Sequence, residues 1–499
     1  MPEIQNIVVL GGGTAGLIAA LTLRRQLPQL AVRLVHSAEI GVIGVGEGTT
    51  PLFPRHIFGV LGLDPARFYA EAQPTWKLGI HFLWGPRKDF FYSFGQQWDA
   101  RWSDLPKAHG YYCFDDLVPA DAPAALMAHD RVAHRRPDGW PQFPTAYAFH
   151  IENKKLVAYL EARCCEDGVT FTEGTVSDVE MRDGEVAALH LESGEKVSGD
   201  LYIDASGFRS ELLGRELGEP FESFADALFC DRAIIGGWPR TNESIHPCTT
   251  AETMEAGWCW QIEHEHFINR GYVFSSAFLS DDAAREELLR KNPKIAAAGI
   301  EPRVVRFRSG RFARNWVGNV VAIGNANGFV EPLEATAIST LIYAMQTLTE
   351  ALRECHRAGS TPTLRETCNR LVADIWTETR DFLAMHYRFN TRLETPFWQH
   401  ARAATPLRTV GPLVAFYEEN GPSMLGRHEL GRHDNIFGIE GHWMMLLGNR
   451  VPHRAPHAAS DDELARWKKH AADFAAQAAG GITLHHALAC IRHPGWRWK

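Results

Sequence analysis

The sequence predicts a mixed α/β fold, with some α+β character. We expect a βαβ-based module split between two segments, a strand-rich insertion and a helical C-terminal part. Three observations predict this. The segment "NIVVLGGGTAGLIAALTLRRQLPQLAVRLVHS" places a glycine turn between apolar runs, short alternating runs fill the middle of the chain, and the pattern from about residue 337 is helical. With 499 residues, 45% of them hydrophobic, the chain can form two or three domains or subdomains.

The N-terminal segment predicts a strand, a glycine turn, a helix and a second strand. The apolar run Ile7–Leu10 is typical of a buried parallel strand, helical periodicity covers Leu17–Leu27 and ends at Pro28, and "VRLV" follows as the next strand. Between strand and helix lies Gly11-x-Gly13-x-x-Gly16. Glycines there permit a tight turn and the close approach of a diphosphate, whose charge a helix N-terminus favours. The pattern therefore predicts a Rossmann-like dinucleotide site; the alternative is a tight turn that binds nothing.

The end of the second strand departs from the usual dinucleotide pattern. An acidic residue normally stands there to hold a ribose. This chain instead has His36, followed by Ser37, and Glu39 is a weaker substitute. A histidine can still hydrogen-bond a hydroxyl.

The rest of the sequence predicts the order of the remaining helices and strands and the bounds of the domains. We expect a helix from about residue 146 to Gly168, then a strand, then short strands joined by D-G and S-G turns. Residues 225–310 are strand-rich, and "NVVAIGNANGF" returns to a buried strand. The nucleotide-binding module is thus predicted to comprise residues 1–225 and 300–345, with the insertion at about 225–300 and a mainly helical part at 346–499.

Composition limits the location and the partners. The net charge is −9 without a basic block, which argues against nucleic acid. No run of about 18 apolar residues occurs, so we expect no membrane span. The nine cysteines are scattered without a C-x-x-C pair, which favours a reduced cytoplasm, and no histidine or cysteine spacing predicts a metal site.

Lys77 has unusual neighbours. It stands in "PTWKLGIHF", beside Trp76 and Leu78. Because removing an ammonium from water is costly, such a lysine is either a reagent or a residue whose stem covers apolar surface. The residues alone leave both interpretations open.

Several motifs identify a family. "DLYIDASGFRS" and "NVVAIGNANGFVEPLEA" resemble the later nucleotide-contacting stretches of flavoprotein monooxygenases, which indicates flavin rather than NAD. Further segments resemble the signatures of the flavin-dependent tryptophan halogenase family, in the family's order across nearly the whole chain: "GVGEGTTP", "WKLGIHF", "GWCWQI", "FVEPLEATAI" and "DFLAMHYRFNTRLETPFW". The resemblance implies an FAD-binding module of the monooxygenase type and a two-component oxidoreductase.

The resemblance also implies a reaction and its residues. FAD, bound as FADH2, would react with oxygen and with chloride or bromide to give hypohalous acid, which is relayed to Lys77 for halogenation of an electron-rich aromatic such as an indole. Glu334 matches the second catalytic residue, while Glu331 is assigned to the start of a helix. Thr336 and Ala337 match the backbone halide site, where the family more often has glycine in place of Ala337. The implied cofactor-binding residues are Gly11, Gly13, Thr14, Ala15, Gly16, Ser37, Glu47, Val176, Asn325 and Ile338.

The substrate side resembles the family less closely. Trp258 and Trp260 match a pair that shields the flavin from organic substrate, although Glu263 replaces the usual proline. Phe94 is at the position that stacks on the substrate ring, Tyr92 stands where the family often has histidine, and Trp443 is a candidate for the pocket wall. The stretch 438–453 lacks the tyrosine pair that grips the amino-acid end of tryptophan. An indole-like ring without that zwitterion is therefore expected, rather than free tryptophan.

The implied partners follow from the missing reductase domain. Since no separate NAD(P)H domain is evident, FADH2 should come from an NAD(P)H-dependent flavin reductase; the chain itself is expected as a monomer or homodimer. Bromide is the easier halide to oxidise, which favours faster bromination. Two alternatives remain: a flavin monooxygenase that hydroxylates an aromatic substrate, and a flavin- or indole-binding protein that has lost activity.

Overall fold

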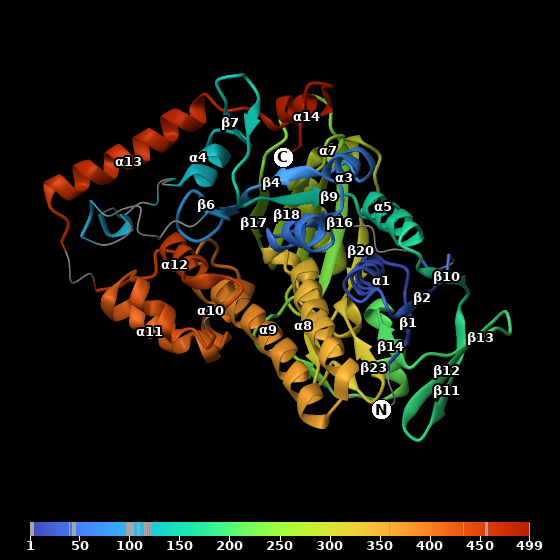
Figure 1. The fold of residues 1–499 in the computed structure, drawn as a ribbon. Helices are drawn as coiled ribbons and strands as arrows, with labels where there is room; N and C mark the ends of the chain where they lie inside the picture. The colour runs from blue at the N-terminus through green and yellow to red at the C-terminus, as the bar shows by residue number, and fades with distance from the viewer. Residues whose placement is uncertain are drawn as a thin grey trace. The chain divides into compact units, whose positions relative to one another are not determined.

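A computed structural model describes residues 4–38, 40–41, 46–95, 104–106, 110–113, 117, 119, 121–358, 360–432, 434–454 and 458–498. Glu39 and the first two residues of "GVGEGTTP" lie outside this set. The chain forms two compact units, each assembled from separated segments. Unit 1 comprises residues 1–73, 151–224 and 307–377, and unit 2 comprises 74–150, 225–306 and 378–499 (Figure 1). The predicted mixed α/β class is confirmed, while the assignment of functions to the predicted parts stays a prediction.

Unit 1 is built on a parallel sheet with the predicted βαβ unit at its centre. Its strand order is β10-β2-β1-β14-β23-β22, and only β22 runs antiparallel to its neighbour. The strands are β1 (Asn6–Leu10), β2 (Ala31–His36), β10 (Thr170–Glu173), β14 (Leu201–Asp204), β22 (Trp316–Val317) and β23 (Val320–Ala322). Helix α1 (Thr14–Gln26) joins β1 to β2 and ends immediately before Leu27, as Pro28 predicts. The carboxyl end of β1 therefore points to the glycine turn.

Helices and small sheets complete unit 1. Helix α5 (Asn153–Glu166) and the first helix of the C-terminal part, α8 (Ala337–Ala358), both pack against α1 (Figure 1). The smaller elements are β3 (Glu47–Gly48), α2 (Leu52–Pro54), η1 (Arg55–Val60), α3 (Pro65–Glu71), β11 (Val176–Arg182), β12 (Glu185–Leu191), β13 (Lys196–Val197), η4 (Gly207–Arg209), η5 (Glu211–Glu216), β15 (Phe221–Ser223), β21 (Gly310–Phe312), η6 (Gly324–Ala326), β24 (Gly328–Phe329) and η7 (Pro332–Glu334).

The predicted helix from residue 146 to 168 is wrong in its first part. Residues Ala148–Ile151 form strand β9, and the helix α5 begins only at Asn153. All four residues of β9 are buried, and the strand pairs antiparallel with β4 (Thr75–Lys77). A short apolar run has no helical or strand periodicity of its own, so long-range pairing decides its conformation.

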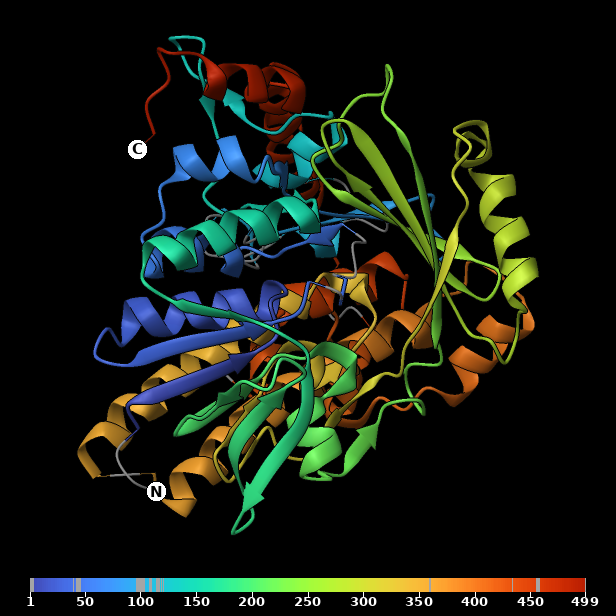
Figure 2. The same cartoon turned by 90° about the vertical axis from the view of Figure 1, so that its right-hand side faces the viewer.

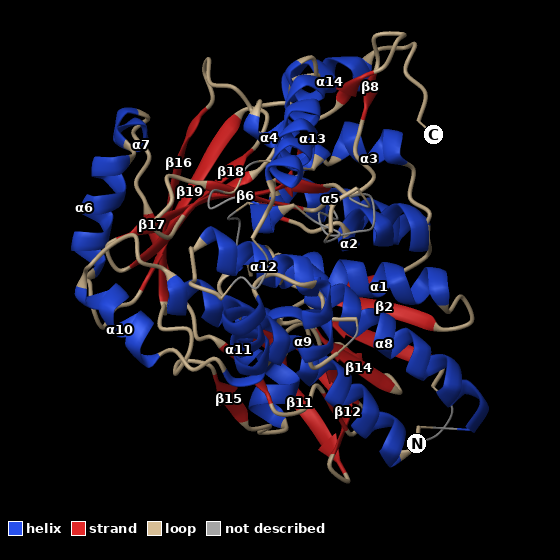
Figure 3. Ribbon diagram, turned by 90° about the vertical axis from the view of Figure 1, so that its left-hand side faces the viewer, coloured by secondary structure: helices blue, strands red, loops and turns tan. Residues whose placement is uncertain are grey.

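Unit 2 contains a seven-stranded sheet with helices on one face. The strand order is β20-β16-β19-β18-β17-β5-β6, from β5 (Gly79–Leu83), β6 (Phe90–Ser93), β16 (Arg232–Pro239), β17 (Thr249–Met254), β18 (Gly257–Glu263), β19 (Phe267–Phe274) and β20 (Arg303–Arg306). Helices α6 (Asp281–Lys291) and α7 (Pro293–Ala297) cover one face of it (Figures 2 and 3). Ile234, Tyr272 and Leu288 lie in the core between sheet and helices. The strand-rich insertion is confirmed, but its two helices were not predicted.

The C-terminal part is helical, as predicted. Helix α9 (Pro362–Phe389) begins in unit 1 and ends in unit 2, and the remaining elements belong to unit 2: η3 (Tyr111–Cys113), α4 (Ala122–Ala128), β7 (His134–Arg135), β8 (Pro141–Gln142), α10 (Pro396–Ala404), η8 (Arg408–Val410), α11 (Gly411–Asn420), η9 (Met424–Glu429), α12 (Gly438–Gly448), α13 (Asp461–Ala479) and α14 (Leu484–Arg492). The long helix α13 packs beside α4 (Figure 1). Among the described residues, none of the helices is both long and apolar enough to span a membrane.

Candidate active site

The glycine turn of unit 1 exposes backbone where a ligand can approach. Gly11 has φ +125°, and a Cβ there would lie 2.3 Å from the carbonyl oxygen of Ala205. A Cβ on Gly16 would lie 1.8 Å from the oxygen of Gly11, whereas one on Gly13 would have no heavy atom within 4 Å. The outer glycines thus fit the turn together, and Gly13 leaves open space before α1. Since the first turn of α1 carries no acidic side chain, the residues fit an anionic diphosphate.

Asn153 links Glu47 to the start of α1 through hydrogen bonds. The side-chain amide of Asn153 donates to Glu47 Oε1 at 3.1 Å and to Thr14 Oγ1 at 3.4 Å. Burial raises the pKa of Glu47 to about 7, and the hydrogen bond from Asn153 opposes this rise. Two predicted residues thereby share a partner that sequence reasoning missed. Its only local signal is the position of Asn153 as the first residue of α5.

The end of β2 brings His36, Ser37 and Val176 together. Ser37 Oγ lies 2.9 Å from Thr175 Oγ1, and Val176 is the next residue along the chain. His36 packs edge-on against Phe171, and a Cβ on Gly12 would lie 2.6 Å from the Cβ of His36. His36 therefore stands directly behind the glycine turn, at the position where an acidic residue was expected.

The segment after β23 returns to α1. Gly324, at φ +55°, begins the turn η6, and a Cβ there would lie 3.0 Å from the Cβ of Ala15. This contact places η6, and with it the predicted Asn325, beside the start of α1. Helix α8 packs against both η6 and α1, so its own start lies in the same region.

The start of α8 has a constrained backbone. Ala335 adopts the left-handed conformation (φ 55°, ψ 38°) that L-residues other than glycine rarely take. The carbonyl of Thr336 accepts the first helical bond from Thr340 at 2.9 Å, so Thr336 caps α8, and Ala337 and Ile338 follow in its first turn. The first N–H groups of a helix have no intrahelical partner and favour an anion. Ser339 Oγ also lies 2.6 Å from Thr50 Oγ1, which links this turn to the segment of Glu47.

The two acidic residues before α8 are both buried. Glu334 ends the short helix η7 and is 4% exposed, and Glu331 immediately precedes η7 and is 0% exposed. The left-handed Ala335 separates Glu334 from the α8 start. Strain of this kind is common where a backbone must present particular groups to a ligand.

Lys77 of unit 2 is fully buried. It ends β4, is 0% exposed, and its Nζ lies 5.4 Å from the centroid of the Phe94 ring. After Lys77 the chain leaves the β4–β9 ladder and enters the seven-stranded sheet as β5. The carbonyl of Leu78, at that transition, accepts the N–H of Phe94 at 2.9 Å. The predicted lysine and the predicted stacking ring are thus neighbours because the β5–β6 hairpin returns to the point where β4 ends.

Trp258 and Trp260 lie on β18 with their ring centroids 6.0 Å apart. They are 0% and 5% exposed, and Gly271 on β19 leaves room for the ring of Trp260. Glu263 ends the same strand, where it pairs with Arg240 and accepts a bond from the amide of Gln261 at 2.6 Å. The residue in the proline position is therefore one half of a buried ion pair.

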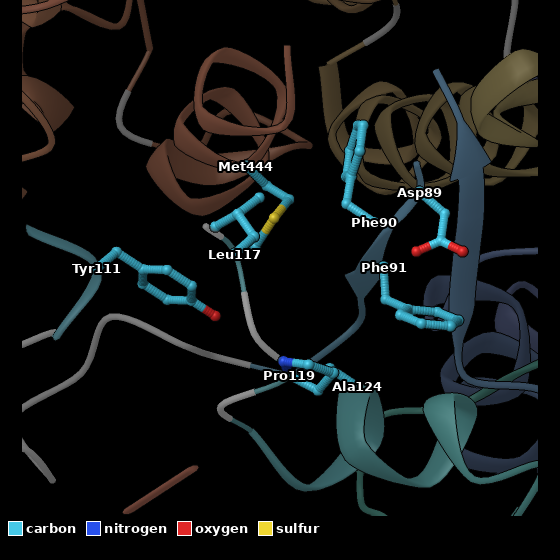
Figure 4. A pocket seen from close by; sticks show the side chains of 8 residues that line it. All are labelled: Asp89, Phe90, Phe91, Tyr111, Leu117, Pro119, Ala124 and Met444. Carbon is cyan, nitrogen blue, oxygen red and sulfur yellow. The ribbon is translucent and has the colours of Figure 1, made fainter. Parts of the chain in front are cut away.

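Trp443 makes the contacts of a core side chain. It is 0% exposed, its indole N–H donates to the carbonyl of Ser423 at 3.0 Å, and its ring lies 5.4 Å from that of Tyr417. The next residue, Met444, lines a hollow with Asp89, Phe90, Phe91, Tyr111, Leu117, Pro119 and Ala124 (Figure 4). Trp443 is not among the described residues that line this hollow, and its predicted substrate contact stays a prediction.

Comparisons with known proteins cover nearly the whole chain. The profile of the family described as "Tryptophan halogenase" matches residues 6–462. Tryptophan 7-halogenase RebH of Lentzea aerocolonigenes is 31% identical over 80% of this chain and 78% of its own. Tryptophan 6-halogenase ThaL of Streptomyces albogriseolus is 32% identical over 88% of this chain and 86% of its own.

Solved structures give the same result. The crystal structure of MibH, described as a lathipeptide tryptophan 5-halogenase, superposes with a TM-score of 0.89 at 36% identity, covering 99% of this chain and 95% of MibH. BrvH, a flavin-dependent halogenase from Brevundimonas, superposes with a TM-score of 0.85 at 29% identity, covering 98% of this chain and all of BrvH.

Proposed function

Because the chain belongs to the tryptophan halogenase family and is a flavin-dependent halogenase, we propose that Lys77 holds hypohalous acid for the halogenation of an electron-rich aromatic ring such as an indole. One observation carries this proposal: a fully buried ammonium group stands 5.4 Å from the ring centroid of Phe94. Burial of a lysine is costly, and a lysine retained in such a place supports a chemical role. An aromatic substrate stacked on Phe94 would lie next to Nζ.

The proposed halogenation can be written with the bonds that form and break and the protons that move. A bound reduced flavin, with oxygen, supplies the oxidising power that converts halide to hypohalous acid. The Lys77 ammonium donates a hydrogen bond to the oxygen of this acid. The ring π electrons then attack the halogen, the oxygen–halogen bond breaks, and the departing oxygen takes a proton to leave as water. A base removes the ring proton, so that aromatic C–H and hypohalous acid become C–X and water.

We assign the remaining roles to unit 1. Glu334 is the proposed base, a buried carboxylate at the end of η7. The N–H groups of Thr336 and Ala337 are the proposed halide donors, since they open α8 after a left-handed residue. The glycine turn, Thr14, Ala15, Ser37, Glu47, Val176, Asn325 and Ile338 would hold FAD, within a flavin module of residues 1–225 and 300–345.

Substrate selection belongs to unit 2 in this proposal. Phe94 would stack on the ring, and Trp258 and Trp260 would separate organic substrate from the flavin. Trp443 and residues 346–499 would support the substrate side. Because residues 438–453 carry no tyrosine, we favour an indole that lacks the free amino-acid zwitterion. Indole itself and a tryptophan within a peptide both meet this condition.

The proposal includes partners and location. FADH2 would be delivered by a separate NAD(P)H-dependent flavin reductase, with chloride or bromide as the halide substrate. We place the enzyme in the cytoplasm, as a monomer or homodimer. Nucleic acid has no role in this scheme.

The decisive experiment compares wild type with Lys77→Ala. Purified protein, FAD, NADH, a flavin reductase and indole are incubated with chloride or bromide, and products are identified by mass spectrometry. A halogenated indole that disappears in the variant supports the proposal. A hydroxylated product that survives in the variant would instead identify an oxygen-inserting monooxygenase. If indole gives no product, an N-acylated tryptophan peptide replaces it; failure with both rings at both halides contradicts the proposed substrate class.

A further inference from the structure

His150 shares a strand face with Lys77. In the antiparallel β4–β9 ladder, Thr75 pairs with His150 and Lys77 pairs with Ala148. Paired residues, and residues two apart on one strand, point to the same face. Lys77 and His150 are therefore diagonal neighbours on one face, and such positions lie about 7–8 Å apart. Both side chains are 0% exposed.

Both ring nitrogens of His150 have defined partners. The backbone N–H of Glu263 donates to Nδ1 at 3.4 Å, so Nδ1 must carry a lone pair. Nε2 lies 2.7 Å from Thr249 Oγ1 and therefore bears the proton that it donates there. Both nitrogens of His150 are therefore engaged in hydrogen bonds.

These bonds join strands that are separate in sequence. Thr249 opens β17, and Glu263 ends β18, the strand of Trp258 and Trp260. Thr75, on the same face as Lys77, donates its hydroxyl to the carbonyl of Glu263. The Lys77 ladder is therefore braced to β17 by one side chain and to the end of β18 by two.

The charges around His150 favour its neutral form. Desolvation lowers its pKa well below the ordinary value of 6.5, and the Coulombic interactions with Lys77, His264 and Arg240 act in the same direction, while the backbone hydrogen bond with Glu263 opposes them. Lys77 comes from β4, His264 follows β18 and Arg240 follows β16. A proton on His150 would place a second cation on the Lys77 face.

We propose that His150 is a positioning residue for Lys77: as a cross-strand brace it holds Nζ beside the Phe94 ring, so that halogen is transferred to substrate instead of escaping as hypohalous acid. This inference rests on the proposed function of Lys77. A displacement of about 1 Å can reduce a rate about 100-fold, although the displaced group remains present. Loss of the brace should thus affect transfer, while formation of the oxidant, assigned to unit 1, continues.

The test measures how the oxidant is partitioned. His150→Phe keeps a ring of similar size but removes both hydrogen bonds, and His150→Asn restores an acceptor near the position of Nδ1. Thr249→Val removes one partner with nearly the same shape and serves if His150→Phe does not fold. With the ring and halide that wild type accepts, each protein is assayed for halogenated product, for hypohalous acid captured by a small trap, and for substrate affinity.

His56 provides a matched control in unit 1. It is also 0% exposed, burial lowers its pKa to about 4, and its Nε2 lies 3.0 Å from Thr22 Oγ1. His56→Phe removes a buried histidine of unit 1, whereas Lys77 belongs to unit 2. It should reduce stability while leaving the ratio of product to trapped oxidant unchanged.

We expect His150→Phe to lower that ratio at least tenfold with total oxidant unchanged, His150→Asn to recover part of it, and Thr249→Val to fall between. A ratio equal to wild type, or a loss of oxidant and product in equal proportion as in a merely destabilised protein, would overturn the inference. Lys77→Ala distinguishes failure of the proposed function from failure of the inference about His150. If Lys77→Ala still halogenates, the proposed function of Lys77 fails. If Lys77→Ala loses halogenation but His150→Phe keeps the wild-type ratio of product to trapped oxidant, only the role of His150 fails.

Discussion

The glycine turn and the Lys77 ladder are two candidate sites built in opposite ways. The turn is made of backbone and of missing side chains: a Cβ on Gly11 or Gly16 would overlap a carbonyl oxygen. The ladder carries the buried side chains of Lys77 and His150, and His150 is hydrogen-bonded to the backbone of Glu263 on another strand. The comparison indicates that added atoms would damage the glycine turn, whereas removed interaction partners would damage the ladder.

The largest expected effect concerns function at the ladder without a matching loss of stability. Lys77→Met keeps an unbranched side chain of similar length and removes the need to bury an ammonium. We expect halogenation to fall about 1,000-fold, while the free energy of unfolding stays within about 1 kcal/mol of wild type. Product formation and urea denaturation measure the two. A variant that loses several kcal/mol would mean that Lys77 is chiefly a structural residue.

The ladder was harder to predict than the turn for a physical reason. Strand, glycine turn and helix follow one another within residues 6–26, so local periodicity and turn chemistry were sufficient. The bond from Thr75 to Glu263 joins residues 188 positions apart, and no spacing rule reaches so far. The same limit explains the error at β9, an apolar run whose strand pairing lies in the distant β4. Lys77 was identified through a family motif, whereas its neighbour His150 had no such signal.

The second effect tests whether partners in the ladder region depend on one another. Arg240 and Glu263 form an ion pair with side chains 6% and 1% exposed. Arg240→Met leaves a buried carboxylate without its cation and should cost about 3–5 kcal/mol of unfolding free energy. Arg240→Met combined with Glu263→Leu should recover most of this loss.

A surface pair is the control. Glu255 pairs with Arg290 at 3.2 Å, and their side chains are 52% and 64% exposed. Arg290→Met should cost less than about 1 kcal/mol because water replaces the lost partner. Equal losses for Arg240→Met and Arg290→Met in thermal or urea unfolding would remove the distinction between buried partners and surface ones.

The third effect adds atoms to the glycine turn. Gly16→Ala forces a Cβ to within 1.8 Å of the Gly11 oxygen, so we expect a stability loss of about 1–3 kcal/mol. Gly13→Ala meets no heavy atom within 4 Å and has φ −80°, so its stability should stay near wild type. Its FAD affinity, read by flavin fluorescence, should fall at least about tenfold because the methyl group occupies the phosphate approach. If Gly13→Ala binds FAD with unchanged affinity, the phosphate must bind elsewhere.

The fourth effect concerns Glu47, a side chain that contributes to the otherwise backbone-made site. Burial raises its pKa from 4.5 to about 7 in the folded chain. The unfolded chain therefore releases this proton first, and stability falls as pH rises from 4.5 to 7 and is level above that. Without flavin, we expect the wild type to lose about 3 kcal/mol across this window relative to Glu47→Gln, which cannot titrate.

Urea unfolding of both proteins between about pH 5 and pH 8 measures this difference. Parallel stability curves would mean that Glu47 ionises in the folded chain as it does in water, with Asn153 outweighing burial. In that case a charged carboxylate would stand beside the turn that we assign to a diphosphate, which opposes anion binding. A wild-type curve that falls away from that of Glu47→Gln as pH rises would instead keep Glu47 protonated near neutral pH, where its hydroxyl can donate to a ligand oxygen. The pH dependence of one buried carboxyl thus decides whether the backbone site also needs a side chain in a particular protonation state.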